Sequence, residues 1–467
     1  MNKYSKLAQN TTIFFIANFG SKALSFLFVR FYTELLTTVE YGIIDLLYTT
    51  ANLATPIITL CITEAVLRFS IDDEQNRGKI LTNGMLVAVL GNLLFVFTAP
   101  LFMKFETFSD NVVWIYLLTF TNCIYTIVAH FSRGIGKSKI FALSGIVHTF
   151  LQIALNILLL VGFSLGIKGY LIASVLSNML TAVVVIVLGK LHTYIMKNID
   201  RKYLKQMIIY AIPLIPNSIF WWIMQFANRY IITFLLSASY NGLYAVANKI
   251  PTLITTISSI FFQAWQISAV EDAKSDNRSS FYTTVFNGFS TMLIVATSAL
   301  MIVLQPLYKI MTEESYHSSW ICVPFLLCAT LFSCYTSFLG TNYVAMKKTK
   351  GVFFTTVGGA IVNVVLNFLL LPFIDIRGTA LATMAAFFVT WITRVFDTRK
   401  FVKIKYSVNG FVLPMIIVVI QATLLTFGVK SVFIQLALFG VICLLCLKTI
   451  IAFAQIGLTF LKKKVKK

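Results

Sequence analysis

Charged residues are scarce in this sequence, and acidic residues are scarcer than basic ones. Of the 467 residues 12% are charged, with 17 Asp and Glu against 38 Lys and Arg, whereas 58% are hydrophobic. The mean hydropathy is +0.84. A chain with so little polar surface cannot cover a water-soluble core of this size. The composition excludes an ordinary soluble protein and indicates an integral membrane protein.

Residues that bind metals are also few, with four His and seven Cys. The cysteines all fall in hydrophobic stretches, and none of the histidines has the spacing of a metal ligand. Cys443 and Cys446 form a C-x-x-C pair, but no histidine or acid stands near it. We therefore expect buried thiols, with no metal site and no tightly bound cofactor.

The sequence lacks the segments that an ATPase or a surface enzyme would need. The stretch GIGKSK (134–139) resembles the end of a phosphate-binding loop, but that motif requires a glycine where this chain has Phe131. The predicted outer loops are short, about 4 to 10 residues each, and leave no room for a catalytic domain. We expect a transporter and not an enzyme.

Fourteen hydrophobic segments are long enough to cross a bilayer as helices. The predicted spans are 12–33, 42–67, 80–103, 112–131, 140–163, 169–190, 208–235, 242–267, 282–306, 317–341, 351–373, 378–396, 410–427 and 432–454. The sequence thus predicts an all-α polytopic membrane protein. Pro56, Pro251, Pro324 and the pair Pro213/Pro216 each remove a backbone donor within these spans and permit kinks.

The basic residues indicate the orientation. With a cytoplasmic N-terminus, 28 Lys and Arg fall in cytoplasmic segments, five in outer loops and five within spans. This asymmetry follows the positive-inside rule and places both termini in the cytoplasm. The net charge of +21 is then a cytoplasmic fringe that faces membrane lipids, and a nucleic-acid partner is not expected.

The sequence contains an internal repeat. LNILLL (155–160) followed by IKGYLIA (167–173) recurs as LNFLLL (366–371) followed by IRGTALA (376–382). Asn156 and Asn367 are 211 positions apart, as are the short basic turns before them. We predict two six-helix lobes, 1–200 and 201–400, followed by helices 13 and 14 with a basic tail in 401–467. Parallel repeats of this kind place a substrate cavity between the lobes and support alternating access.

Cations inside the predicted spans are the best functional signal, because a Lys or Arg at mid-membrane costs roughly 2.5 to 3.5 kcal/mol and normally faces a bundle interior or an aqueous cavity. Lys22 lies near the middle of the first span, and Arg30 follows it toward the outer side. Arg229 and Lys249 lie in the outer parts of spans 7 and 8. We expect these four cations to line a positive chamber between the lobes.

Local alternatives remain for the predicted charges. Arg30 can instead pair with Glu34 one turn on, and Arg229 can extend to the outer interface. Asp45 is a candidate partner of Arg30 or Lys22, or a protonatable coupling site. The remaining candidate, for gating, is the i, i+4 pair of Glu64 and Arg68, which we expect to form a local salt bridge.

Several motifs resemble a known family over nearly the whole chain. They are YGIIDL (41–46), EAVLRF (64–69), IKGYLIASVLSN (167–178), YAIPLIPNSI (210–219) and GLYAVANKI (242–250). These motifs resemble those of the bacterial lipid-linked oligosaccharide flippases, the O-antigen and capsule exporters of the multidrug/oligosaccharidyl-lipid/polysaccharide superfamily. In this resemblance Lys249 falls where relatives often carry a basic cavity residue.

The resemblance implies a MATE-like fold of about fourteen helices in the bacterial cytoplasmic membrane. It implies transfer of an undecaprenyl-pyrophosphate-linked sugar repeat from the cytoplasmic to the outer leaflet. H⁺ and Na⁺ are the candidate coupling ions, and a polysaccharide polymerase and chain-length machinery are the candidate partners. Two alternatives stay open. A multidrug/cation antiporter would favour deep acids, whereas deep cations outnumber acids here, and a membrane-embedded polymerase would want a large outer loop.

Overall fold

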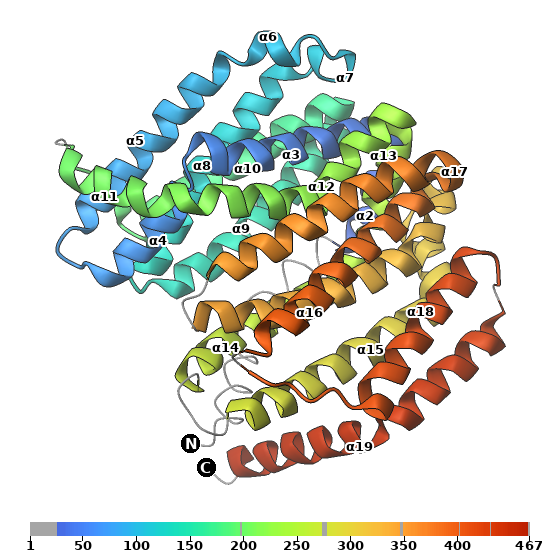
Figure 1. Cartoon of the computed structure of the whole chain (residues 1–467). Coiled ribbons are helices and arrows are strands. Elements are labelled where there is room, and N and C mark those ends of the chain that lie inside the picture. Colours follow the sequence, from blue (N-terminus) through green and yellow to red (C-terminus); the bar gives the residue numbers. More distant parts are fainter. Residues whose placement is uncertain are drawn as a thin grey trace. The chain divides into compact units, whose positions relative to one another are not determined.

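The described part of the chain is helical and contains no strand. The computed structural model describes residues 26–196, 199–272, 278–345, 349–400, 402–429 and 431–465. The first helices are α2 (Val29–Leu35), α3 (Thr38–Ile58), α4 (Ile62–Asp72), α5 (Arg77–Val96), α6 (Ala99–Phe102), α7 (Glu106–Ser109), α8 (Val112–Gly134), α9 (Ser138–Asn156), η1 (Ile157–Gly162), α10 (Gly166–Leu188), η2 (Leu191–Tyr194), α11 (Arg201–Ala211) and η3 (Ile212–Leu214) (Figure 1). They are followed by α12 (Ile215–Leu235), α13 (Ala238–Ala247), α14 (Pro251–Asp272), α15 (Arg278–Met311), η4 (Glu314–Cys322), α16 (Val323–Ala345), α17 (Thr349–Thr398), η5 (Val408–Val412), α18 (Leu413–Thr426) and α19 (Val432–Val465).

Ten helical segments in the described ranges are long and apolar enough to cross a membrane, or up to eleven if the bent pair α3 and α4 forms one span. α17 is counted once although it holds two predicted spans, which meet at the non-helical backbone of Ile374 and Asp375. The predicted span 242–267 is divided between α13 and α14. The all-helical, multi-pass class is confirmed, and the count of about fourteen helices stays a prediction.

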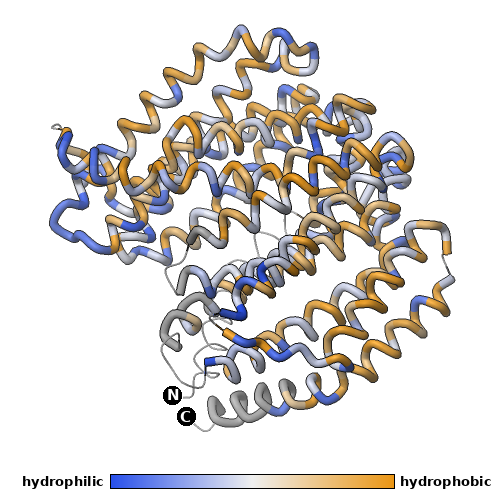
Figure 2. The backbone as a smooth tube through the Cα atoms, viewed as in Figure 1, coloured by the Kyte–Doolittle hydropathy of each residue, from blue (hydrophilic) through white to orange (hydrophobic). Residues whose placement is uncertain are grey.

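Several long helices are mostly hydrophobic, and turns between helices are hydrophilic, as expected for helices that cross a membrane. Figure 2 shows hydrophobic residues along most of α5, α8 and α10, and hydrophilic residues at the turn between α4 and α5 and at the start of α11. Many large apolar side chains are exposed on the helices, for example Leu94 at 68% and Phe150 at 64%. A lipid-facing surface explains these exposed apolar side chains.

The chain divides into two compact units. The N-terminal unit contains Ala17–Trp222 and Leu236–Ala245, and the C-terminal unit contains Ile223–Leu235 and Val246–Lys467. α13 therefore belongs almost wholly to the N-terminal unit, although it follows α12 in sequence. The lobe boundaries predicted at residues 200 and 400 stay a prediction.

α8 is central to the N-terminal unit, where it packs against α3, α4, α5, α9 and α10. Fully buried side chains such as Ile62, Ile127 and Met207 join α4, α8 and α11 in one apolar core. In the C-terminal unit α16 packs against α14, α15, α17 and α18. Stacked aromatic rings fill that core, with Trp265 against Phe338 at 4.6 Å between ring centroids. Each unit thus has a core of its own.

The repeated motifs adopt matching local structures in the two units. Asn156 and Asn367 are both fully buried. Ser164 and Asp375, again 211 positions apart, both have a positive φ of 51°. The glycine of each IxG motif packs so closely on the preceding helix that an added Cβ would lie 3.1 Å from the Leu159 oxygen in one repeat and 2.6 Å from the Leu370 oxygen in the other. These shared features of the turn support the repeat read from sequence.

Candidate functional site

Lys22 and Arg30 were predicted to share one cavity. Lys22 lies outside the described residues. Arg30 is on α2 and forms an ion pair with Glu34, with 2.6 Å between Nε and Oε1. Both side chains are about half exposed, at 44% and 49%. The local pairing considered for Arg30 is therefore present.

Arg229 is buried within the C-terminal unit, with 7% of its surface exposed. Its Nη1 donates to the Gln225 carbonyl oxygen at 3.0 Å, and its guanidinium carbon lies 4.9 Å from the centre of the Phe226 ring. The carbonyl and the ring face stabilise the cation away from water. Extension of this side chain to the outer interface, the alternative for Arg229, does not fit its burial.

Lys249 lies where the eighth predicted span is interrupted. Residues 248–250 form a turn between α13 and α14, and α14 begins at Pro251, which has no N–H to continue the helix. The backbone N–H of Lys249 donates to the Val246 carbonyl at 3.0 Å, and the side chain is partly exposed. Interrupted membrane helices are tolerated where they line a cavity or are covered by protein. The role of Lys249 in a substrate cavity stays a prediction.

Asp45 lies on α3 beside α13, within the N-terminal unit. The amide nitrogen of Asn241 donates to the Gly42 carbonyl at 2.9 Å and lies 3.5 Å from an Asp45 carboxylate oxygen. Gly42 and Gly242 allow this crossing, because a Cβ added to either would lie 1.9 Å from a carbonyl oxygen of the other helix. The amide of Asn241 thus contacts Asp45, and the pairing of Asp45 with Arg30 or Lys22, like its coupling role, stays a prediction.

The predicted salt bridge between Glu64 and Arg68 is replaced by another pair. Arg68 forms its ion pair with Asp72 at 2.9 Å, again with i, i+4 spacing. Glu64 is exposed in the first turn of α4. The sequence offered two acids at equal spacing from Arg68, and spacing alone does not choose between them.

Each unit contains a cluster of buried polar side chains that sequence reasoning did not assign to a site. In the N-terminal unit Gln152 hydrogen-bonds to Ser174 and Ser177, at 3.0 and 2.7 Å. In the C-terminal unit the Asn367 amide donates to Asn228 at 3.0 Å. The repeated Asn367 is a sequence signal for the second cluster, whereas its counterpart Asn156 donates to the Tyr32 hydroxyl at 3.1 Å.

Arg394 is the most deeply buried cation on the described helices that the sequence did not single out. Only 1% of it is exposed, and its three nitrogens donate to Thr355, Thr336 and Thr356 at 3.1, 2.9 and 3.0 Å. These contacts join α16 to both arms of α17. Arg394 lies two residues before the predicted end of span 12, so the sequence groups it with the cytoplasmic cations.

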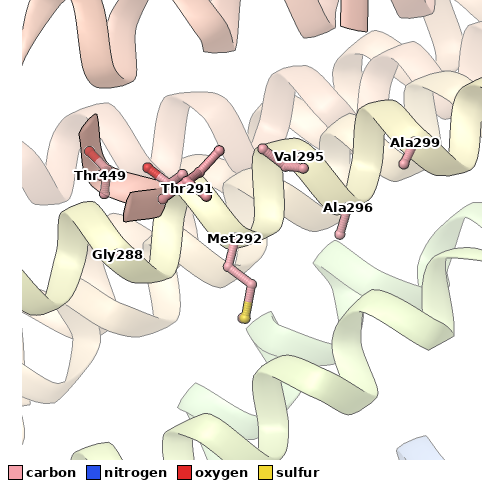
Figure 3. A pocket seen from close by; sticks show the side chains of 8 residues that line it. Gly288, Thr291, Met292, Val295, Ala296, Ala299 and Thr449 are labelled. Carbon is pink, nitrogen blue, oxygen red and sulfur yellow. The ribbon is translucent and has the colours of Figure 1, made fainter. Parts of the chain in front are cut away.

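The described residues contain no group of three His, Cys, Asp or Glu side chains that could hold a metal. All seven cysteines are free thiols, six of them buried and Cys443 partly buried. A groove of about 360 Å³ lies in the C-terminal unit between α15 and α19 (Figure 3). Its lining is Gly288, Thr291, Met292, Val295, Ala296, Ala299, Thr449 and Ile450. Apart from two hydroxyls, the groove presents apolar atoms.

Helices long and apolar enough to span a membrane, repeated turns and broken spans together define a polytopic membrane protein. Residues 7–266, more than half of the chain, match the family described as polysaccharide biosynthesis protein. The chain belongs to that family. A search of curated proteins finds no match.

Solved structures of transporters share the fold. A lipid II flippase MurJ in an inward closed conformation aligns with a TM-score of 0.71 and 14% identity, over 96% of this chain and 100% of that chain. An inward-facing multidrug resistance MATE family transporter of the MOP superfamily aligns at 0.61 and 12%, over 90% and 96%. A mutant of the Vibrio cholerae MATE transporter VcmN aligns at 0.56 and 12%, over 85% and 97%. The predicted MATE-like fold is confirmed.

Proposed function

We propose that this protein is a flippase that moves undecaprenyl-pyrophosphate-linked oligosaccharide repeat units from the cytoplasmic to the outer leaflet of a bacterial cytoplasmic membrane by alternating access. The observation that carries the proposal is the match to a polysaccharide biosynthesis family in a chain with a flippase fold. The distribution of Lys and Arg supports cytoplasmic termini. In this role the protein supplies repeat units to a polysaccharide polymerase and its chain-length machinery.

The substrate pyrophosphate requires cations inside the membrane. We assign its recognition to Lys22, Arg30, Arg229 and Lys249. A phosphate oxygen bound to Lys or Arg gains charge-assisted hydrogen bonds, which are stronger at low dielectric than in water. Because Arg30 shares its charge with Glu34, we expect Arg229 and Lys249 to contribute more than Arg30.

The lipid chain of the substrate requires an apolar surface that opens to the bilayer. The groove between α15 and α19 supplies such a surface within the C-terminal unit. Met292 and Ile450 are exposed along it, and the small side chains of Ala296 and Ala299 leave room beside them. Each CH₂ buried there contributes about 0.8 kcal/mol. We propose that part of the prenyl chain lies in this groove during transfer.

An antiporter for drugs or cations is the second candidate, because MATE transporters share this fold. An antiporter is expected to bind its coupling ion at an acid within the membrane. Asp45 is the acid that we assign to this role, and Glu64 and Arg68 are the candidates for gating. Coupling to H⁺ or Na⁺ through Asp45 is compatible with either candidate.

A test in cells separates the two candidates. Replacing both Lys22 and Lys249 by Gln should stop surface polysaccharide production and cause lipid-linked repeat units to accumulate, with the protein still present in the membrane. The matched control is Lys309→Gln, at an exposed lysine near the outer end of α15. Normal polysaccharide in the double variant contradicts the headgroup assignment. Loss of drug resistance with normal polysaccharide, after deletion of the gene, favours the antiporter.

A further inference from the structure

The second predicted span, 42–67, is broken at residues 59–61. α3 ends at Ile58, α4 begins at Ile62, and the two helices meet at an angle of 57°. The residues of the break lie within the apolar core of the N-terminal unit, where Cys61 is 5% and Ile62 0% exposed. Because the break is buried in this core, it is part of the packed structure and not a frayed helix end.

Two consecutive residues of the break have left-handed backbone. Leu60 has φ of 52° and Cys61 has φ of 55°. The N–H of Leu60 donates to the Ile57 carbonyl at 3.2 Å, and the N–H of Cys61 donates to the Pro56 carbonyl at 2.9 Å. This pair of bonds is the Schellman closure of a helix, in which the left-handed position normally holds glycine. The chain has leucine there, and a side chain strains this conformation.

Neighbouring helices hold the break in place. Gly91 of α5 lies so close that a Cβ would be 2.0 Å from the Ile58 carbonyl oxygen. The Cys61 sulfur lies 3.8 Å from the Ser218 hydroxyl of α12. The hydroxyl of Thr55 on α3 and that of Thr59, which directly follows α3, donate to carbonyls one turn back, at 2.8 and 2.7 Å, and such bonds favour bending. Packing therefore stabilises a backbone that its own residues disfavour.

The helical alternative is open to the same residues. Leucine is a good helix former, and a straightened segment replaces the left-handed closure with regular helical bonds. Pro56 already removes one bond from this part of α3, so the segment resists rearrangement less than an unbroken helix. The leucine thus lowers the free-energy difference between bent and straight forms, whereas a glycine would favour the bent form.

The two sides of the break have different partners. α3 contacts α13 through Gly42 and Gly242, whereas α4 packs against α5, α8 and α11. α4 also carries the exposed Glu64 and Arg68. A change of angle at the break therefore moves these two charges relative to α3.

We propose that Leu60 and Cys61 form a strained pivot in the second membrane span, which alternates between this bent form and a straighter form during transport. The inference rests on the proposed alternating access. The bent form is the one described here, and straightening relieves two left-handed residues while it disrupts the contacts of Ile58 with Gly91 and of Cys61 with Ser218.

The pivot can be tested without knowledge of the substrate. Spin labels on unnatural amino acids at the exposed positions Val39 and Ile71 report the distance between the outer end of α3 and the inner end of α4. In the full-length protein in lipid we expect two distances for the wild type. Leu60→Gly should shift the population toward the bent distance by about five- to tenfold relative to Leu60→Ala, which removes the same side chain but keeps the left-handed strain.

Transport by the same variants completes the test. Leu60→Gly should flip lipid-linked oligosaccharide several-fold more slowly than Leu60→Ala, although it should be the more thermally stable of the two. Cys61→Gly and Cys61→Ala form a second, independent pair with the same expectation. A single distance that is identical in the wild type and both pairs overturns the pivot and shows a fixed kink. If the wild type flips no oligosaccharide, the proposed function fails, and the distance measurement still decides the pivot.

Discussion

The crossing of α3 and α13 at Gly42 and Gly242 makes a quantitative prediction. A Cβ on Gly42 would lie 1.9 Å from the Ala238 oxygen, whereas ordinary contact begins near 3.4 Å, so Gly42→Ala must separate α3 and α13 by about 1.5 Å. Separation also weakens the bond from Asn241 to the Gly42 carbonyl and the bond between the Thr38 and Ser239 hydroxyls, at 2.9 and 2.8 Å. Overpacking and the lost bonds together cost about 2–4 kcal/mol, after a helix-propensity gain of about 1 kcal/mol for alanine.

The assay is thermal or denaturant unfolding of purified protein. Gly145→Ala is the matched control, because Gly145 lies on α9 with nothing within 4 Å of an added Cβ. That variant should be as stable as the wild type or slightly more stable. Gly242→Ala should resemble Gly42→Ala, and the double variant should lose less than the sum of the two by at least about 1 kcal/mol, because one displacement relieves both clashes. A Gly42→Ala variant as stable as the Gly145→Ala control would refute the crossing.

Three further predictions concern charged groups. Arg394→Lys should destabilise the protein by about 1–2 kcal/mol more than Arg394→Met, because lysine keeps a buried charge but loses the hydrogen bonds of the guanidinium. Thermal unfolding measures the two stabilities, and a lysine variant that is more stable than the methionine variant contradicts this. Side-chain hydrogen bonds from Asn76 and then Tyr203 lower the pKa of Asp73 below 3.8, so these bonds stabilise the fold above about pH 4 and are lost as the pH falls. Carbon NMR of the Asp73 carboxyl should show a higher pKa in Tyr203→Phe, and an unchanged pKa argues against the bond from Tyr203. Arg30→Gln should change stability by less than about 1 kcal/mol, because its ion pair is exposed, yet should slow export, and an unaltered export rate removes Arg30 from the headgroup site.

The sequence predicts much of the fold because membrane spans depend on the length and composition of hydrophobic segments. The repeat is equally readable, since Asn156 and Asn367 occupy equivalent buried positions and Ser164 and Asp375 share a positive φ. The breaks are only partly readable. Pro251 marks the interruption at Lys249, whereas the break at Leu60 has no glycine at its left-handed position and only Pro56 to suggest it.

The candidate cations show where sequence reasoning ends. Depth in a span identifies Arg229 as costly to insert, but only packing shows that a carbonyl and an aromatic ring surround it. Arg68 has acids at i−4 and at i+4, and the pairing with Asp72 depends on side-chain positions that the spacing leaves open. Arg394 stands so near a predicted helix end that the positive-inside rule accounts for it fully, and its burial depends on the threonines of other helices.

The most direct test of the proposed function is flipping by the purified protein. Proteoliposomes would contain a fluorescent undecaprenyl-pyrophosphate-linked oligosaccharide, and a membrane-impermeant reagent would report its transfer between leaflets. Wild-type protein should move the substrate, Lys249→Arg should retain most of the rate, and Lys249→Gln should lose most of it while keeping its fold. Equal rates for the wild type, Lys249→Gln and protein-free vesicles would contradict a lipid-linked oligosaccharide flippase that uses an intramembrane cation.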